Sequence, residues 1–340
     1  MAHPHGIHHV TAIATDPQAN VDFYISVLGL RLVKTTVNFD DPGTYHLYYG
    51  DEAGSPGTVL TFFPWPGAPR GRVGTGQATT VAFSVPEGAL GWWDDHLTRL
   101  GIDHSGPARR LEEEVVSLRD PDGMVLELVA HAGSADAPPW ERGPIGADAA
   151  VRGFHSVTLT EQDLDPTHQM MAERLSFQVV AEDGGRVRYD AGATGIGTIV
   201  DVVGQPGGPR GLTAAGTVHH VAFRAPDLAT EMDWRGELLD QGVNVTEMRD
   251  RQYFKSIYFR EPGGVLFEIA TDEPGFTADE PLLELGRHLK LPPWLEPSRE
   301  QIAATLPQLK IPAVNYPGLD TEAVLPDRAT AGPTGGGADA

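Results

Sequence analysis

The chain has 340 residues, of which 40% are hydrophobic, so it can bury the cores of two ordinary domains or of one duplicated domain. Its formal net charge of −22 argues against nucleic acid and anionic membranes as partners. The absence of cysteine excludes disulfides, zinc–thiolate sites and thiol nucleophiles, so any metal ion must be held by histidine, carboxylate and water.

The N-terminal residues M-A-H-P-H-G lack the basic and apolar regions of a signal peptide. No apolar run approaches the length that crosses a membrane. We therefore expect a cytoplasmic protein. The 40 glycines and 28 prolines favour many short strands joined by turns over a helical bundle.

Four segments of the chain resemble one another and predict a duplicated fold. Each opens with an alternating run that is typical of a strand, as in G-I-H-H-V-T-A-I-A (6–14) and H-H-V-A-F-R-A-P (219–226). Each closes with a glycine-led apolar run, as in G-V-L-F-E-I-A (264–270). We expect an α+β fold in which four strand–helix–strand–strand–strand (βαβββ) modules form paired, curved mixed sheets. The modules are predicted at 7–65, 77–131, 151–204 and 216–271.

Each module should contain one helix. Asp16-Pro17 and Pro226-Asp227 are typical helix-entry signals. The helices are predicted at 20–28, 90–100, 166–175 and 228–239.

The Pro- and Gly-rich segment 132–150 divides the modules into two pairs. We expect an N-terminal pair within residues 1–145 and a C-terminal pair within 146–275, the latter carrying most of the metal site. Residues 276–340 form a C-terminal extension with a helical stretch at 282–289. Its end should be disordered from about Ala329.

Glu268 is the residue around which the chemistry is organised. It lies between Phe267 and Ile269 with no Lys or Arg adjacent, and a buried charge of this kind needs a cation. Because equivalent positions of homologous modules converge, we compare two columns of residues. The four opening strands supply His9, Thr80, Ser156 and His220, and the four closing strands supply Thr61, Glu127, Asp201 and Glu268.

Only a pairing of the first module with the fourth brings two imidazoles and a carboxylate together, namely His9, His220 and Glu268. This ligand set with open positions is typical of non-haem Fe(II) oxygen chemistry. Glu127 and Asp201 are interpreted as relics of the duplicated site, with a solvated or salt-bridged role. Seven other histidines lack a repeat-equivalent partner and are interpreted as structural or exposed: His46, His96, His104, His131, His155, His168 and His288.

The order and spacing of H-H-V-T (8–11), H-H-V-A-F (219–223) and P-G-G-V-L-F-E (262–268) resemble the vicinal oxygen chelate superfamily. Segments 22–36, 45–64 and 152–156 further resemble its hydroquinone-type ring-cleaving dioxygenases, and the likeness covers about residues 6–278. The resemblance implies an Fe(II) centre, with Mn(II) as the alternative, bound by His9, His220 and Glu268. It also implies an aromatic diol and O2 as substrates.

The resemblance further implies catalytic roles for His8, His219, Arg251 and Tyr258, and substrate-binding roles for Arg251, Tyr258 and Thr11. Strand alternation places Thr11 on the face of His9, whereas His8 and His219 would need a strand start or a bulge to join them. The subgroup tends to have a glycine after the pocket arginine, and here Gln252 takes its place.

The hypothesis is therefore an extradiol-type dioxygenase that cleaves a hydroquinone or catechol-like diol. His219 or Tyr258 would take the phenolic proton, and Arg251 would hold a second hydroxyl or an oxyanion. The competing interpretation of Arg251 is a surface salt bridge with Asp250 or Glu247.

Three other functions stay open. A glyoxalase-type isomerase or lyase generally has a fourth protein ligand, where this chain has Thr61. A metal-dependent thiol transferase of the fosfomycin-resistance kind uses two histidines and one glutamate, usually in a chain half as long. A metal-free module could bind an aromatic drug without catalysis. The oligomeric state also stays open, with a homo-oligomer among the options.

Overall fold

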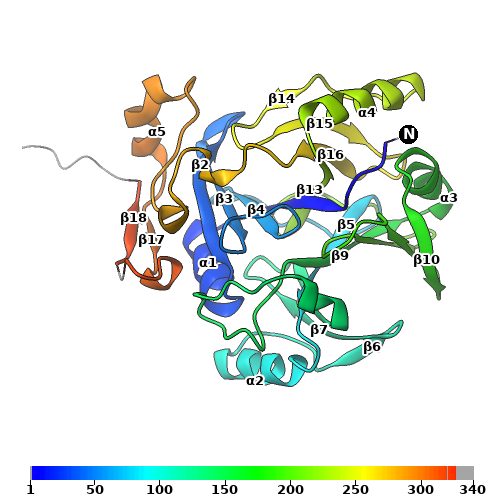
Figure 1. The fold of residues 1–340 in the computed structure, drawn as a ribbon, viewed down its shortest axis with the longest axis horizontal. Helices are drawn as coiled ribbons and strands as arrows, with labels where there is room; N and C mark the ends of the chain where they lie inside the picture. The colour runs from blue at the N-terminus through cyan, green and yellow to red at the C-terminus, as the bar shows by residue number, and fades with distance from the viewer. Residues whose placement is uncertain (1, 320, 327–340) are drawn as a thin grey trace, which may run out of the picture.

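The computed structural model describes residues 2–319 and 321–326. Two curved, mixed eight-stranded sheets lie side by side, with the helices on the outside (Figure 1). The elements follow the predicted order of four βαβββ modules, so the predicted fold is confirmed.

The first sheet combines the first and fourth modules in the strand order β14-β15-β16-β13-β1-β4-β3-β2. The first module supplies β1 (Ile7–Ala14), α1 (Pro17–Asp22), β2 (Arg31–Asn38), β3 (Asp41–Gly50) and β4 (Val59–Pro64). The fourth supplies β13 (Thr217–Ala225), α4 (Leu228–Asp240), β14 (Arg249–Asp250), β15 (Lys255–Arg260) and β16 (Leu266–Thr271). The pairing of the first module with the fourth is thus confirmed.

The second sheet combines the second and third modules in the order β10-β11-β12-β9-β5-β8-β7-β6. The second module supplies β5 (Gln77–Val85), α2 (Leu90–Leu100), β6 (Ala108–Arg110), β7 (Glu113–Arg119) and β8 (Val125–Ala130). The third supplies β9 (Phe154–Glu161), α3 (Leu164–His168), β10 (Gln178–Asp183), β11 (Arg186–Asp190) and β12 (Ile199–Gly204). Each sheet therefore joins modules from both halves of the chain, and the domain division at residues 145 and 275 stays a prediction.

The closing strand of each module starts two residues after the first residue of its predicted run, because the leading glycine forms a turn. Gly57, Gly123, Gly197 and Gly264 all have φ between 71 and 117°. This backbone region is accessible to glycine without steric cost. The four strands begin directly afterwards, at residues 59, 125, 199 and 266.

The four predicted helices are present, but two of them are only partly α-helical. α1 begins at Pro17, where the Asp16 carboxylate accepts hydrogen bonds from the backbone of the first turn. It continues as the π-helix η1 (Phe23–Val27), and α3 continues as the π-helix η3 (Gln169–Arg174). A π turn inserts an extra residue into the helical period, so a 3.6-residue pattern does not reveal it.

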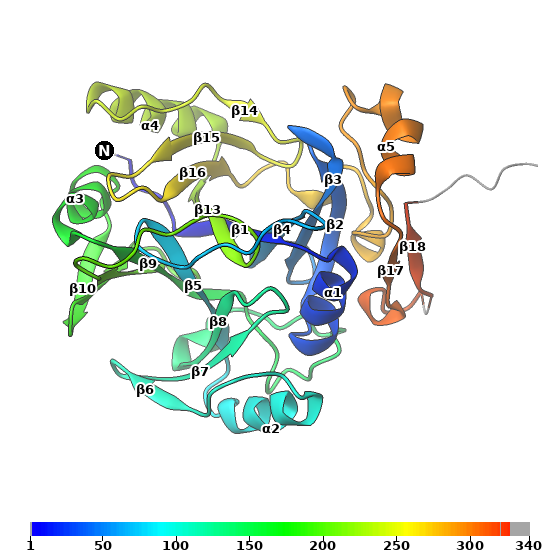
Figure 2. The same cartoon turned by 180° about the vertical axis from the view of Figure 1, so that it is seen from behind.

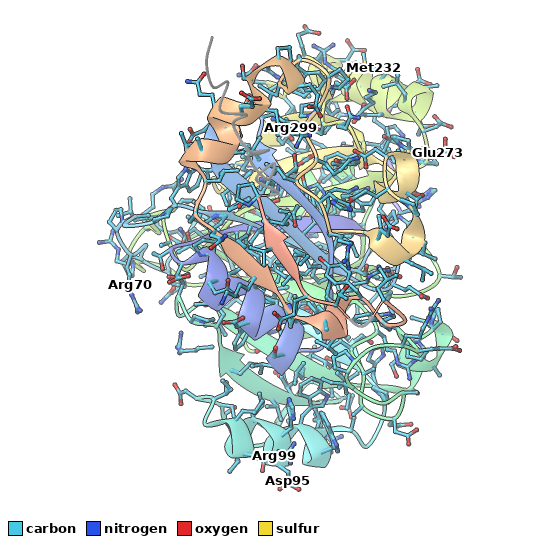
Figure 3. All side chains as sticks on the ribbon, turned by 90° about the vertical axis from the view of Figure 1, so that its left-hand side faces the viewer. Arg70, Asp95, Arg99, Met232, Glu273 and Arg299 are labelled. Carbon is cyan, nitrogen blue, oxygen red and sulfur yellow. The ribbon has the colours of Figure 1, made fainter. Side chains whose placement is uncertain are left out.

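The C-terminal extension packs along the flank formed by α1, β2 and β3 (Figures 2 and 3). It contains α5 (Arg299–Thr305), β17 (Leu309–Ile311), β18 (Ala323–Leu325) and the 3-10 turns Phe276–Ala278, Leu282–Glu284, Glu296–Ser298 and Ala313–Asn315. A further 3-10 turn, Ala132–Asp136, follows β8. The fully buried Lys34 of β2 anchors the extension through ion pairs with Asp279 and Glu280.

The helical stretch predicted at 282–289 is wrong. Gly286 adopts φ 75°, and a Cβ there would lie 2.3 Å from the Leu32 carbonyl oxygen, so the chain turns against β2 instead of continuing as a helix. The disorder predicted from Ala329 falls outside the described residues. Among the described helices, none has the length and apolar character needed to cross a membrane.

The apolar core lies between the sheets and their covering helices. Trp93 of α2, Leu238 of α4 and Phe267 of β16 belong to one buried cluster. Because strand residues alternate between faces, the core-facing Phe267 and Ile269 leave Glu268 on the opposite face. The polar columns of the modules therefore meet on the faces turned away from the core.

Candidate metal centre

Two irregularities in the ladder between β1 and β13 shape the His-His pairs. The antiparallel register passes from Ile7↔Phe223 to His9↔Ala222, which leaves His8 as an extra residue. It then passes from Thr11↔His220 to Ala12↔Val218, which leaves His219 as an extra residue. Such bulges redirect side chains and occur next to active sites. The bulges that His8 and His219 would need in order to leave the regular strand alternation are therefore present.

Three side chains converge on one point of the first sheet. His9 Nε2 lies 3.3 Å from His220 Nε2, and Glu268 Oε2 lies 3.4 Å and 2.9 Å from these two nitrogens, respectively. All three side chains are buried, and Glu268 is fully so. Neighbouring ligand atoms of an octahedral ion with bonds of about 2.1 Å stand about 3.0 Å apart. The triangle therefore has the size of one face of a metal coordination sphere.

Within the part of the chain that the structure describes, no lysine or arginine forms an ion pair with the Glu268 carboxylate. Neither of its oxygens accepts a hydrogen bond from a described residue, and the two imidazoles are the partners in its ion pairs. Burial alone would raise the pKa of Glu268, but His9 and His220 outweigh it and hold the pKa well below its usual range. An ionised, buried carboxylate that faces two imidazole lone pairs suits a divalent metal ion. The residues present thus fit the metal that the sequence led us to expect.

The first histidine of each pair contacts the second. His8 Nδ1 lies 2.9 Å from His9 Nδ1, and His219 Nδ1 lies 2.7 Å from His220 Nδ1. Metal-binding histidines commonly donate their other ring N–H to a neighbouring acceptor, which fixes the tautomer and the orientation of the ring. His8 and His219 are in position to accept these protons. His8 also hydrogen-bonds the backbone of Thr271, so its ring is held from both sides.

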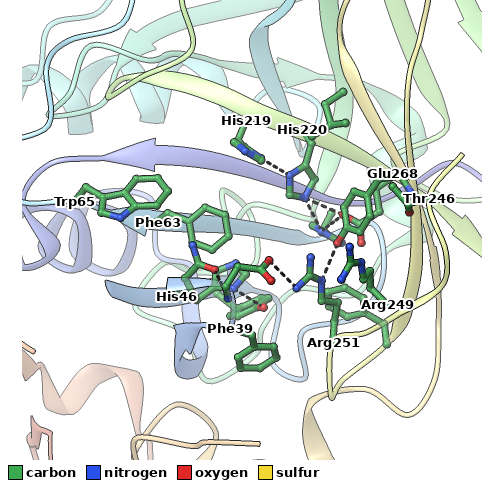
Figure 4. A pocket seen from close by; sticks show the side chains of 17 residues that line it. Phe39, His46, Phe63, Trp65, His219, His220, Thr246, Arg249, Arg251 and Glu268 are labelled. Atoms are coloured by element: carbon green, nitrogen blue, oxygen red, sulfur yellow. Dashed lines mark hydrogen bonds and ion pairs between the residues drawn. The ribbon is translucent and has the colours of Figure 1, made fainter. Parts of the chain in front are cut away.

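A cavity of about 440 Å³ opens in front of the triad (Figure 4). Its size suits a small organic ligand. Aromatic rings supply much of the wall: Phe39, His46, Tyr48, Phe63, Trp65, Phe254 and Tyr258. A planar aromatic substrate fits a cavity with such walls.

Comparison with known proteins bears on this site directly. Residues 6–128 and 153–269 match the family model described as the Glyoxalase/Bleomycin resistance protein/Dioxygenase superfamily. The chain belongs to this superfamily. The matched residues include all three residues of the triad.

Individual relatives within the superfamily align along most of the chain. The chain is 46% identical over 297 residues to the "Putative ring-cleaving dioxygenase MhqO" of Bacillus subtilis, covering 87% of this chain and 94% of that protein. It is 35% identical over 309 residues to the "Chlorohydroquinone/hydroquinone 1,2-dioxygenase" of Sphingobium indicum, covering 88% and 95%. A crystal structure titled "putative dioxygenase" from Bacillus subtilis superposes with a TM-score of 0.87 at 44% identity, covering 92% and 99%.

Arg251 and Tyr258 lie together in the wall of this superfamily member's cavity. Arg251 Nε donates a hydrogen bond to Tyr258 Oη over 3.0 Å, and its Nη1 lies 3.1 Å from Asp40 Oδ2. The competing partners are engaged elsewhere, because Asp250 pairs with Lys255 and Glu247 with Arg235. Gln252 follows with φ 70°, so it adopts the backbone conformation that the subgroup's glycine would adopt more easily.

Two predicted site residues do not line the cavity. His8 lies behind His9 and borders a separate space of about 160 Å³. Thr11 is fully buried, and its hydroxyl contacts the Thr61 hydroxyl at 2.8 Å. His8 contacts the cavity-lining His9, and Thr11 is linked to the cavity through Thr61 and His46. His219, Arg251 and Tyr258 line the cavity directly.

His46 lines the cavity, although its sequence context gave it a structural or exposed role. Its Nε2 lies 2.8 Å from the Thr61 hydroxyl, and its Nδ1 lies 2.8 Å from Tyr48 Oη. A signal for it existed. Tyr48 is the cross-strand partner of Thr61, and His46 shares its strand face, so the Thr61 column could have led to both.

Proposed function

We propose that the chain is a ring-cleaving dioxygenase that uses Fe(II), or alternatively Mn(II), and O2 to cleave a hydroquinone or catechol-like diol. One observation carries the proposal. Two imidazole nitrogens and one carboxylate oxygen converge in a buried cup that opens into an aromatic-walled cavity. Two histidines and one carboxylate with open positions suit non-haem iron oxygenases. The names of the relatives support the same reaction class.

His9, His220 and Glu268 would hold the metal, which when bound lowers the pKa of a coordinated diol hydroxyl and supplies electron density for the reaction with O2. The aromatic walls orient the ring and keep bulk water from the site. Burial and the charge of Glu268 raise the pKa of Tyr258, so its hydroxyl stays protonated at neutral pH. Tyr258 and Arg251 are therefore proposed to donate hydrogen bonds to substrate oxygens.

The contact between the histidines changes the role proposed for His219. A metal-binding His220 Nε2 leaves the ring proton on Nδ1, which points at His219 Nδ1. His219 then accepts that proton's hydrogen bond and carries its own proton on Nε2. Burial and His220 lower the pKa of His219 to about 3, so the ring is neutral. It is better placed to donate a hydrogen bond than to act as the base.

A neutral acceptor for the diol proton is available on the wall formed by the first module. Burial lowers the pKa of His46 well below its usual value, so this imidazole is neutral but a weak base, and it can take a proton only in a concerted transfer. Its Nδ1 faces Tyr48 Oη, which lines the cavity. We propose that the diol proton passes to Tyr48 Oη while the Tyr48 proton moves to His46 Nδ1.

The test is anaerobic reconstitution with Fe(II) or Mn(II), followed by oxygen-electrode assays over a panel of hydroquinones and catechols. We expect stoichiometric metal, consumption of one O2 per diol, and a ring-opened product. Isomerisation of a thiol adduct without O2 would favour a glyoxalase-type function, and consumption of a thiol would favour a transferase. Tight binding of aromatics to protein without metal would favour a sequestering module.

A further inference from the structure

Two arginines from the β14 region line the cavity beside Glu268 (Figure 4). Arg249 lies in β14 and Arg251 follows two residues later, so both side chains can project to the same side of the strand. Asp250 lies between them, and its carboxylate is 2.5 Å from Lys255 Nζ instead. The local backbone thus directs two guanidinium groups into one cavity.

The two arginines differ in their partners. Arg251 is held by Tyr258 and by Asp40 of the opposite wall. No residue within 2–319 or 321–326 forms a hydrogen bond or ion pair with the Arg249 guanidinium. The acids nearest in sequence, Glu247 and Asp250, are engaged by Arg235 and Lys255. Arg249 is exposed where it lines the cavity, so it contributes an unpaired positive charge at the solvent-facing side, because a guanidinium stays protonated in proteins.

The cavity also has more room than a plain diol needs. A cavity of about 150 Å³ is enough to hold benzene. The cavity in front of the triad is about 440 Å³, so a ring of that size leaves more than half of it for substituents. The spare volume and the uncompensated charge lie in the same cavity.

We propose that Arg249 binds a carboxylate carried by the aromatic ring, so that the preferred substrates are anionic diols such as dihydroxyphenylacetates. This inference rests on the proposed function for its reaction, but not for its binding site. The planar guanidinium matches a carboxylate with two parallel hydrogen bonds. The net charge of −22 opposes the approach of anions from a distance, but physiological salt screens it beyond about 8 Å. Contact with Arg249 therefore decides the preference.

The experiment compares 2,5-dihydroxyphenylacetate with its methyl ester, which has nearly the same shape but no charge. Binding to the metal-loaded protein is measured by calorimetry under anaerobic conditions, where no oxidation occurs. Oxygen uptake with the same pair gives the kcat/KM ratio. The variants are Arg249→Gln, Arg249→Lys and, as a control, Arg109→Gln, whose side chain is 71% exposed on the second sheet.

We expect the wild-type protein to bind the acid about tenfold more tightly than the ester or better, as hydrogen bonds to charged groups allow. Arg249→Gln should remove this preference while the ester keeps its affinity, which also shows that the variant is folded. Arg249→Lys should retain part of it, and Arg109→Gln all of it.

Equal affinities for the acid and the ester in the wild-type protein would overturn the inference, as would a preference that survives in Arg249→Gln. A charge preference that depends on Arg249, without oxygen uptake for any diol, would support this site and contradict the dioxygenase. Oxygen uptake with equal kcat/KM for both compounds would support the dioxygenase and contradict the carboxylate site at Arg249.

Discussion

In the first sheet Glu268 of β16 faces two histidines, whereas in the second sheet Asp201 of β12 faces two arginines. Asp201 accepts hydrogen bonds from Arg188 Nε and Nη2 at 2.8 and 3.0 Å, and Arg186 Nη1 lies 2.8 Å from its Oδ2. The two sheets have the same register here. Arg188 is the cross-strand partner of Asp201, and Tyr258 is the partner of Glu268.

Glu127, the closing-strand carboxylate of the second module, is neutralised in the same way. Glu127 forms an ion pair with Arg110, so of the solvated and salt-bridged roles expected for Glu127 and Asp201, both residues have the salt-bridged one. Their interpretation as relics stays a prediction. The fold thus places a buried carboxylate on both sheets, and each needs a cation. The second sheet supplies guanidinium groups. The first sheet places a tyrosine at the equivalent position, so its carboxylate faces two imidazoles, a set that could hold a metal ion.

The sharpest test removes the acids and the imidazoles one at a time. His9→Ala, His220→Ala and Glu268→Ala should each abolish both stoichiometric metal and oxygen uptake, because each removes one of the three proposed protein ligands. Asp201→Ala in the second sheet should leave the metal content of the folded protein unchanged. Metal analysis and an oxygen electrode measure both quantities. A ligand variant with full activity would remove that residue from the set.

The second test removes one arginine from the pair that neutralises Asp201. Arg188→Met removes the cation that Asp201 and Glu113 share, while Arg186 still faces Asp201 and His155 still faces Glu113. Breaking a buried ion pair costs about 3–5 kcal/mol of the free energy of unfolding, and the remaining partners should keep the loss at or below the lower end of that range. Denaturant unfolding measures it.

The matched controls for this test are two. Arg109→Gln, an exposed arginine, should change the free energy of unfolding by less than about 0.5 kcal/mol. The double variant Arg188→Met with Asp201→Leu should regain part of the loss, because the charge is then gone from both partners. An Arg188→Met protein as stable as the wild type would mean that the arginine network contributes nothing.

The third test gives the first sheet the arginine–carboxylate pair of the second sheet. Tyr258→Arg places a guanidinium opposite Glu268, as Arg188 stands opposite Asp201. The new ion pair should compete with the metal and lower its affinity about 100-fold, with little change in melting temperature. Competition with a fluorescent chelator measures the affinity. Tyr258→Phe is the control and should keep the metal while losing only the hydroxyl's hydrogen bonds. Undiminished metal affinity in Tyr258→Arg would mean that an arginine opposite Glu268 does not compete with the metal ion.

These sheets also show what the sequence could predict. The four modules, the pairing of the first with the fourth and the convergence of His9, His220 and Glu268 follow from alternation and repeat columns. Those patterns depend on short-range periodicity and on equivalent positions in the repeats. The roles of the site residues, beyond their positions, stay predictions.

Features that depend on strand register or on contacts between distant residues could not be predicted from these patterns. The bulges at His8 and His219 need a register that only the paired strands define. The partner of Arg251 is Asp40, which is distant in sequence, and not the acids beside it. The helix predicted at 282–289 failed because Gly286 packs its backbone against Leu32, a tertiary contact that local propensity cannot reveal.

A third buried acid extends the comparison, and its predicted effect per pH unit is smaller than the effects above. Glu231 of α4 is fully buried, and neither oxygen has a hydrogen-bond partner among the described residues. Among the described residues, no arginine pairs with Glu231 and no group of candidate metal ligands includes it. Burial and the charge of Glu268 raise the pKa of Glu231 to about 8, so near neutral pH this acid keeps its proton instead.

Because Glu231 is buried in its protonated form, the free energy of unfolding depends on pH with a defined sign. Between the unfolded pKa near 4.5 and the folded value of about 8, the folded chain holds a proton that the unfolded chain releases, so stability falls as pH rises through that window. Glu231→Gln removes the dependence, and its advantage over the wild type should grow by at most about 1.4 kcal/mol per pH unit. Denaturant unfolding from pH 5 to 8.5 measures it, with the exposed Glu112→Gln as the control. Parallel wild-type and Glu231→Gln curves would mean that Glu231 is ionised in the folded protein, and that a cation reaches it as one reaches Asp201.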